Sequence, residues 1–259
     1  MELTDAQWEI LAPLLPAGKS GPGKRGRPPI NNRPVLEGIL WILRTGARWK
    51  DLPKDFPPYQ TCHRRFSAWV HSGALERVLK ALAEDLARRG KLDLGETFID
   101  GSFASAKKGG RDVGKTKRGK GTKIMAIAER AGLPVAIRTA SASPHEVKLV
   151  DATLDARFTQ AQPERMIGDK AYDSDPLDER LKEQRGIEMI APHRIVKNRK
   201  KDPTQDGRPL RRYRRRWKVE RLFAWLHNFR RIVVRWDYYP EHYLGFIQLG
   251  CILILLRHF

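Results

Sequence analysis

The sequence predicts an α/β protein in which a mixed β-sheet with flanking helices follows a small all-helical unit. Apolar residues recur at helical spacing through the first ninety positions, whereas short apolar runs of strand length alternate with helical segments after residue 95. Three such runs precede the first helix of the second part, which indicates a sheet that begins with an antiparallel meander. We therefore expect two domains, residues 1–90 and 91–259, joined at residues 91–95.

The first ninety residues carry clear helix signals. A capping-box pattern at residues 4–7 opens a short helix that two prolines end, and glycines close three further apolar-periodic segments, at 34–45, 59–72 and 74–89. The helix that begins near Tyr59 leaves four polar side chains facing outward: Thr61, His63, Arg64 and Arg65. This arrangement resembles helix-turn-helix packing, in which such side chains face a DNA major groove. A helical bundle with a solvated basic face is the alternative.

The glycine- and proline-rich loop at residues 17–34 contains Arg25 and Arg27 in an Arg-Gly-Arg-Pro sequence. Short arms of this kind lie in narrow minor grooves, where arginine senses the enhanced negative potential. A plain solvated linker fits the same residues.

The second part alternates strands and helices. Five strands are expected, at 97–100, 124–128, 133–138, 165–168 and 187–190, with helices opening at residues 143 and 176. The loop between the first two strands is rich in glycine and in basic residues: Lys107, Lys108, Lys115, Lys117, Arg118, Lys120 and Lys123. This composition indicates a loop that contacts phosphates.

Charge is the strongest compositional signal, since 50 Lys and Arg oppose 30 Asp and Glu, for a net charge of +20. Such a balance favours polyanionic partners. The two cysteines have no metal or redox spacing and nothing resembles a signal peptide, so we expect a cytoplasmic, nucleoid-associated protein. The apolar tail at 244–256 is shorter than the roughly 20 residues of a membrane span, which predicts a buried or interface helix and no membrane contact.

Three carboxylates carry the chemistry that we expect. Asp100 and Asp169 each end a short apolar run, and Glu220 lies among basic residues on a segment of helical spacing, on one face with Tyr213 and Arg216. Mg²⁺ prefers oxygen ligands, and two divalent ions about 3.5–4 Å apart can serve both ends of a phosphodiester displacement. The three acids therefore predict a metal site for DNA phosphodiester chemistry, although Glu220 by itself also fits an ion-paired surface acid. The histidines are too scattered to indicate zinc.

The order of these motifs resembles the bacterial insertion-sequence transposases of the DDE class, specifically the group resembling insertion sequence five. The resemblance rests on motifs spread over nearly the whole chain: Leu3–Trp8, Gly46–Pro53, Ile99–Ser102, the basic loop at Lys107–Gly110 and Lys115–Lys123, Gly168–Ser174 and Tyr213-x2-Arg216-x3-Glu220. It implies a ribonuclease-H-like fold, dependence on Mg²⁺ or Mn²⁺, and movement of an element bounded by inverted repeats.

One position departs from the family pattern. A basic residue, often lysine, usually stands seven residues after the glutamate, and His227 stands there in this sequence. His227 need not be charged at neutral pH, and Arg231, expected on the same helix face, is an alternative DNA contact. The basic run at 194–218 fits a clamp on phosphates or a solvated segment, while Trp217 and Trp225 are expected in the core.

The function that we expect is that of a DNA transposase acting on double-stranded terminal inverted repeats and target DNA. The alternatives are a sequence-specific DNA-binding regulator and a nuclease on the same fold. Because one set of carboxylates makes one active site and an element has two ends, a homodimer or higher oligomer on DNA is expected. The tail at 244–256 is expected to pack mainly on its own sheet, and a partner would cover the rest.

Overall fold

The structure is a computed structural model that describes residues 3–16, 30–193 and 210–259. Its N-terminal part is helical, as the sequence predicts. The elements, including two 3₁₀ turns, are α1 (Asp5–Leu11), η1 (Ala12–Leu14), α2 (Asn32–Thr45), η2 (Trp49–Asp51), α3 (Tyr59–His71) and α4 (Ala74–Arg88). The capping box that opens α1 is confirmed, since the Thr4 hydroxyl accepts from Gln7 N at 3.2 Å and the Gln7 amide accepts from Thr4 N at 3.3 Å.

A seven-stranded mixed sheet follows. Its strands are β1 (Thr97–Ala106), β2 (Gly114–Thr116), β3 (Gly119–Glu129), β4 (Pro134–Ser141), β5 (Arg165–Ile167), β6 (Glu188–Ile190) and β7 (Val234–Arg235). The strand order is β2-β3-β1-β5-β6, with β4 paired to β3 and β7 paired to β1. β1, β3 and β4 form the expected antiparallel meander, while β5, β6 and β7 run parallel to their neighbours. The sequence missed β2 and β7 because three and two residues are too few to show alternation.

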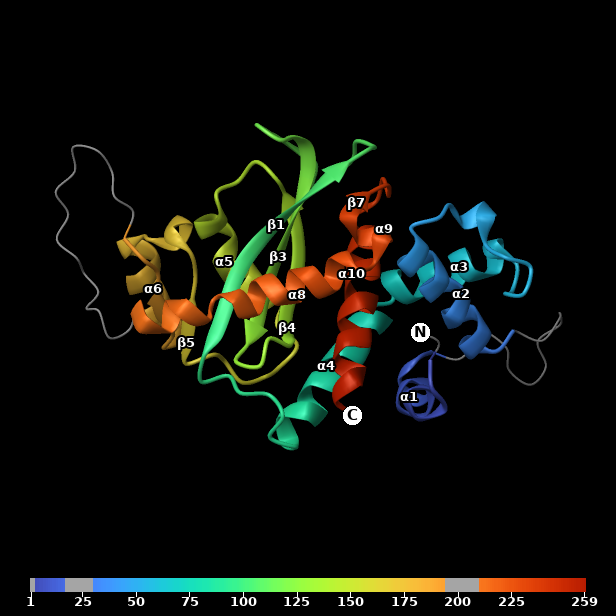
Figure 1. Cartoon of the computed structure of the whole chain (residues 1–259), viewed down its shortest axis with the longest axis horizontal. Coiled ribbons are helices and arrows are strands. Elements are labelled where there is room, and N and C mark those ends of the chain that lie inside the picture. The colour runs from blue at the N-terminus through green and yellow to red at the C-terminus, as the bar shows by residue number, and fades with distance from the viewer. Residues whose placement is uncertain (1–2, 17–29, 194–209) are drawn as a thin grey trace.

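Helices and 3₁₀ turns connect and cover the strands. They are η3 (Glu146–Leu149), α5 (Val150–Asp155), η4 (Lys170–Tyr172), α6 (Asp175–Arg185), η5 (Arg211–Arg215), α8 (Trp217–His227), α9 (Arg230–Val233), α10 (Pro240–Leu255) and η6 (Leu256–His258). α8 contacts β1 and β3 and crosses in front of β1 in Figure 1. The helix that carries Glu220 therefore lies across the strand that carries Asp100.

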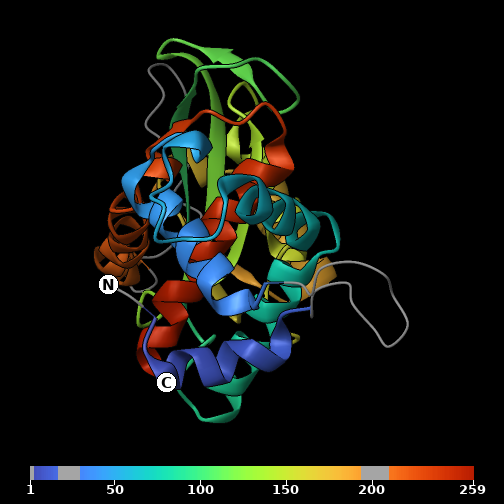
Figure 2. The ribbon, with the colours of Figure 1, turned by 90° about the vertical axis from the view of Figure 1, so that its right-hand side faces the viewer.

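The C-terminal helix α10 joins the two parts of the chain. It packs against α2, α3 and α4 as well as against β4, so it lies between the N-terminal helices and the sheet (Figures 1 and 2). Phe66 of α3 and Phe246 of α10 stack with ring centroids 4.4 Å apart. The apolar tail is thus buried largely against helices of its own chain, and its packing on the sheet is only part of its burial. The hydrophobic core is continuous across residue 90, so the two-domain division stays a prediction.

The apolar tail was compared above with the length of a membrane span. Among the described residues, no helix is both long enough and apolar enough to cross a bilayer.

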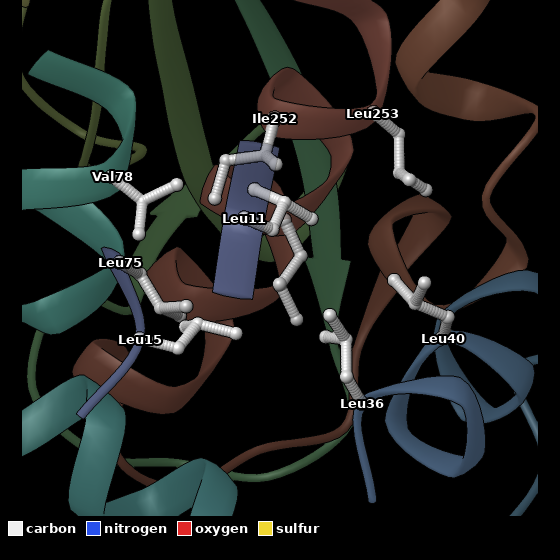
Figure 3. Close-up of a pocket in the computed structure, with 9 residues that line it drawn as sticks. Leu11, Leu15, Leu36, Leu40, Leu75, Val78, Ile252 and Leu253 are labelled. Atoms are coloured by element: carbon white, nitrogen blue, oxygen red, sulfur yellow. The ribbon is translucent and has the colours of Figure 1, made fainter. Parts of the chain in front are cut away.

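A small apolar space lies where α1 meets α2, α4 and α10. It is lined by aliphatic side chains and encloses ≈ 10 Å³ (Figure 3). That volume is about one water-sized probe, and a site without polar partners does not hold ordered water. The space is a packing defect beneath α1, and none of its lining residues is a predicted site residue.

Candidate active site

Two of the predicted carboxylates lie just past the paired residues of the neighbouring parallel strands β1 and β5. β1 and β5 pair with Phe98 opposite Ile167, and two residues further along each chain come Asp100 and Asp169. Asp169 is separated from the end of β5 by Gly168 and caps η4, where its Oδ1 accepts from Ala171 N at 2.7 Å. The sequence suggested that Asp100 ends its strand, but β1 continues to Ala106. Asp100 stands just past the point at which the parallel pairing stops.

One guanidinium connects Asp100 to the third carboxylate. Arg216 donates to Asp100 Oδ2 through Nη1 and to Glu220 Oε1 through Nη2, both at 2.7 Å. The predicted continuous helix is wrong in detail, because the chain forms the 3₁₀ turn η5 before α8 begins at Trp217. The spatial grouping is nevertheless present, since the Arg216 guanidinium also lies 6.0 Å from the Tyr213 ring centroid. Arg216 is largely buried, so it is an internal link and not a free surface cation.

The buried Tyr172 ring reports the electrostatics of this region. Burial raises the pKa of its hydroxyl well above the ordinary value, and the negative charges of Glu146, Asp100 and Asp169 raise it further. Burial also raises the pKa of Asp100, although the positive charge of Arg216 opposes that shift. Three acids from three separate segments therefore lie close enough to Tyr172 to act on its hydroxyl.

Glu146 is the residue that sequence reasoning missed. It opens η3 after the Ser-Pro-His turn, and a Cβ built on Gly101 would lie 3.0 Å from its Oε1. Its charge raises the pKa of Asp100, and its Oε1 accepts from Lys123 Nζ at 3.2 Å. The only sequence signal was an acid in a helix-opening turn, which is an ordinary capping pattern. Only the fold brings it beside Asp100.

The chemistry of these groups suits a hard divalent cation, because carboxylate oxygens are the ligands that Mg²⁺ and Mn²⁺ accept. Within residues 3–16, 30–193 and 210–259, however, no three Asp, Glu, His or Cys side chains are arranged to hold a metal ion. The Arg216 guanidinium supplies the positive charge between Asp100 and Glu220. The donor chemistry fits a divalent ion, which would replace Arg216 as the positive partner of both Asp100 and Glu220.

The predicted phosphate-contacting residues divide into two groups. Those of the loop and hairpin after β1 are exposed: Lys107, Lys108, Lys115, Lys117, Arg118 and Lys120. Lys123 is not available, because its Nζ pairs with Glu146 and also donates to Pro144 O at 2.9 Å. Its position inside β3 thus engages Lys123 within the protein, and its role in DNA contact stays a prediction.

The residues that follow Glu220 also divide. His227 is exposed at the end of α8, where its ring stacks on Phe223 and its Nε2 lies 3.4 Å from Ser102 Oγ. Partial burial of the ring lowers the pKa of His227 below its ordinary value. Arg231 is buried, ion-paired to Asp237 at 2.9 Å, and its guanidinium lies 5.2 Å from the Phe246 ring centroid. Arg231 lies on α9 and not, as expected from the sequence, on the same helix as Glu220, and its DNA contact stays a prediction.

In the helical part, only one of the four predicted α3 side chains is exposed. Arg64 faces solvent, and Thr61 is half-buried. The ring of His63 packs edge-on against Trp49 and against His242, and Arg65 bonds to Asn32 within the helical part. The expectation that all four face outward is wrong for His63 and Arg65. Arg25 and Arg27 lie outside the described residues.

Part of the basic run before Glu220 forms ion pairs within the protein. Arg212 and Arg215 both pair with the buried Glu96, at 3.1 and 2.7 Å. Trp217, which we expected in the core, is exposed, with Lys218 Nζ 4.2 Å and Arg221 Cζ 4.8 Å from its ring. Trp225 is half-buried against the core, as expected. Residues 194–209 of the run lie outside the described residues.

Comparison with known proteins assigns the family. The model described as "Transposase DDE domain" matches residues 92–255, and the one described as "Putative transposase of IS4/5 family" matches residues 3–79. The first covers well over half of the chain, so the chain belongs to the family of DDE-domain transposases. It is a DNA transposase of bacterial insertion-sequence type, an enzyme of DNA strand cleavage and transfer.

Individual relatives agree with this family. The chain is 35% identical over 117 residues to the "Insertion element IS402 uncharacterized 16.2 kDa protein" of Burkholderia cepacia, covering 44% of this chain and 80% of that one. It is 33% identical over 142 residues to the "Putative transposase for insertion sequence element IS402" of the same organism, covering 52% and 62% respectively. A solved piggyBac transposase synaptic complex with hairpin DNA shares the fold, with a TM-score of 0.54, 12% identity, and coverage of 99% of this chain and 73% of that one.

Proposed function

We propose that this transposase binds the terminal inverted repeats of an insertion sequence and cuts and joins DNA strands at Asp100, Asp169 and Glu220. The observation that carries the proposal is the arrangement around Arg216, which holds Asp100 and Glu220 together while Asp169 lies two residues beyond the end of the neighbouring strand β5. A sheet with an antiparallel meander followed by parallel strands, crossed by the helix of the third carboxylate, supports a ribonuclease-H-like catalytic core.

Asp100, Asp169 and Glu220 would hold Mg²⁺ or Mn²⁺, with two ions as the expected number. Ions bound there supply charge neutralisation and activation of the attacking oxygen. The chain's own residues do the positioning. Strand β1 and the end of β5 position the two aspartates, Arg216 holds Glu220 near Asp100, and Glu146 adds negative charge beside Asp100.

DNA contact is proposed at three places among the described residues. The exposed cations after β1 would neutralise backbone phosphates, which contributes affinity that is independent of sequence. Arg64 on α3 would reach a major groove, with Thr61 beside it, and this would make the helical part a helix-turn-helix-like reader of the terminal repeats. Tyr213, Arg216 and His227 would flank the reacting strand. Two protomers, one for each end, are the smallest assembly that this chemistry requires.

Single-turnover cleavage of a terminal-repeat duplex tests the assignment of the catalytic residues. The substitution Asp169→Ala should lower the cleavage rate at least about a thousandfold, because metal-bound charge stabilisation contributes several kcal/mol to such reactions. Binding of the duplex should stay within about threefold of wild type, since one carboxylate in the site contributes little to affinity. Glu183→Ala, at an exposed acid on α6, is the matched control.

Three outcomes would overturn the proposal. Cleavage by the Asp169→Ala protein at the control rate would remove Asp169 from the active site. Tight, sequence-specific binding by wild type with no cleavage in Mg²⁺ or Mn²⁺ would favour a regulator instead. A nuclease would cut the duplex but leave no product in which its 3′ end is joined to a second DNA.

A further inference from the structure

A group of exposed aromatic side chains lies on the segment that joins β7 to α10. Trp236 is 44% exposed, Tyr238 is 54% exposed and Tyr239 is 59% exposed, which are high values for residues of this size. Soluble proteins seldom expose several large aromatic rings on one short segment without a partner. We call Trp236, Tyr238 and Tyr239 the aromatic loop.

The aromatic loop is held in place by a buried arginine. Arg235, with 0% of its surface exposed, donates to the carbonyl oxygens of Asp237 (3.0 Å) and Tyr238 (2.9 Å) within that loop. It also donates to the carbonyl oxygens of Arg111 (2.8 Å) and Asp112 (3.2 Å), and to Thr122 Oγ1 (2.6 Å). These five bonds occupy the five N–H groups of the guanidinium. One side chain thus fastens the aromatic loop to the basic segment after β1.

The backbone fastens the same two segments. β7 runs parallel to the end of β1, with Ala106 opposite Arg235. The residues that follow these two strands are therefore Lys107 and Trp236. Lys107 N donates to Arg235 O at 3.0 Å. Gly110 has φ +116, and a Cβ there would lie 2.4 Å from Tyr238 O, so only glycine allows this approach. Figure 1 shows β7 beside the far end of β1.

The rings are therefore fixed next to cations and not next to free acids. Lys107 and Lys108 are exposed beside the aromatic loop. Glu241 pairs with Arg111, Asp237 pairs with Arg231, and Asp112 places its charge near Arg235, where it partly offsets the lowering of the Arg235 pKa by burial. The two tyrosine rings meet edge to face, with centroids 5.4 Å apart, and Tyr239 also meets His242 at 5.7 Å. Rigid rings with neighbouring cations match unpaired nucleotides, whose bases stack and whose phosphates carry charge.

We propose that the aromatic loop, with Lys107 and Lys108, binds unpaired nucleotides of a DNA strand that leaves the active site. The inference rests on the proposed function, because strand cleavage is what frees such nucleotides. The distance from the active site to the aromatic loop follows from β1, which runs from one to the other. Asp100 and Ala106 are six residues apart, which at about 3.3 Å per residue is about 20 Å. A DNA strand advances about 3.4 Å per nucleotide, so about six nucleotides cover the distance from the cut.

Equilibrium binding of a labelled oligothymidine of about 12 nucleotides, measured by fluorescence anisotropy with the full chain, tests the proposal. The double substitution Trp236→Leu with Tyr239→Leu keeps apolar bulk but removes two stacking rings. We expect it to weaken oligothymidine binding about five- to a hundredfold. The matched double substitution Trp236→Phe with Tyr239→Phe keeps the rings and should stay within about threefold of wild type.

Two further measurements make the result decisive. Binding of a blunt terminal-repeat duplex should be unchanged in the Leu variant, because paired bases cannot stack on the loop. The Asp169→Ala protein should bind oligothymidine like wild type, which separates this site from the catalytic assignment even if that assignment fails.

Three outcomes would overturn the proposal. The first is unchanged oligothymidine binding by the Leu variant. The second is an equal loss on single strand and duplex, which would indicate a general effect on fold or charge. The third is a loss of protein self-association in sedimentation without loss of oligothymidine binding, which would make the loop a protein-docking surface.

Discussion

Arg216 and Arg235 are two inward-facing arginines whose partners differ in charge. Arg216 bonds to two carboxylates, Asp100 and Glu220, whereas Arg235 bonds to four backbone carbonyls and one hydroxyl. A carboxylate can exchange an arginine for another cation, because its charge attracts any positive group. A buried carbonyl that loses its donor has no such replacement. The first arrangement is therefore suited to a site that changes during a reaction, and the second to a permanent clamp.

The comparison teaches that residue type alone does not decide the role of a basic residue in a basic protein. Arg231 illustrates the same point, since its Asp237 partner and the Phe246 ring hold it in the core although the helical spacing suggested a surface contact. The partner, its charge and its burial assign the role. Four predictions test or sharpen this distinction.

The largest effect is expected at the clamp. Arg235→Leu should lower the free energy of unfolding by roughly 3 kcal/mol or more, because several buried acceptors lose their donors at once. Chemical denaturation measures the change. Arg230→Leu, at an exposed arginine five residues earlier, should change stability by no more than about 0.5 kcal/mol. Equal effects of the two substitutions would show that Arg235 is not a clamp.

The next effect concerns the carboxylate that the sequence did not reveal. Glu146→Gln should slow cleavage about 10- to 100-fold, as for groups that orient the residues of a metal site, while duplex binding stays unchanged. Glu146 raises the pKa of Asp100, so its removal should lower that pKa. Activity that requires ionised Asp100 would then persist to lower pH, and the acidic limb of the pH–rate profile should move down. An unshifted limb would limit Glu146 to a structural role.

A smaller effect is expected when the internal cation is removed. Arg216→Gln should bind Mn²⁺ about tenfold more tightly in the absence of DNA, because Asp100 and Glu220 lose a competing positive charge. Isothermal titration calorimetry measures this affinity. Arg214→Gln, at an exposed arginine on the same turn, should bind Mn²⁺ like wild type. Weaker Mn²⁺ binding by the Arg216 variant would mean that Arg216 supports the metal site and does not occupy it.

The smallest effect is expected at His227, at the far end of α8 from Arg216. Its pKa is lowered by burial, so the ring is neutral at pH 7 and gains charge only as the pH falls through that pKa. His227→Lys should therefore raise duplex affinity about two- to fivefold at pH 7, a gain typical of one exposed charge. The gain should shrink as the pH is lowered, and salt-dependent binding at two pH values measures it. A gain independent of pH would separate the effect from the charge of His227.

Local signals explain most of what sequence reasoning predicted correctly. Thr4 with Gln7 marked the start of α1, Gly46 the end of α2, and Gly73 the break between α3 and α4, because caps and helix-ending glycines act within a few residues. The meander of β1, β3 and β4 followed from apolar runs separated by a turn. The two-residue β7 gave no such signal, since its pairing with β1 depends on residues more than a hundred positions away.

The sequence by itself determined the family and the order of the longer helices and strands, and it predicted the three carboxylates, because motifs and periodicity depend on neighbouring residues. Only the tertiary structure decided that Glu146 lies beside Asp100, that Lys123 and Arg231 are engaged inside the protein, and that Arg235 joins two distant loops. The physical reason is that burial and the charge of a partner arise from segments far apart in the chain. The identity of a charged residue in a sequence does not reveal whether its side chain contacts a carboxylate, a carbonyl group or water.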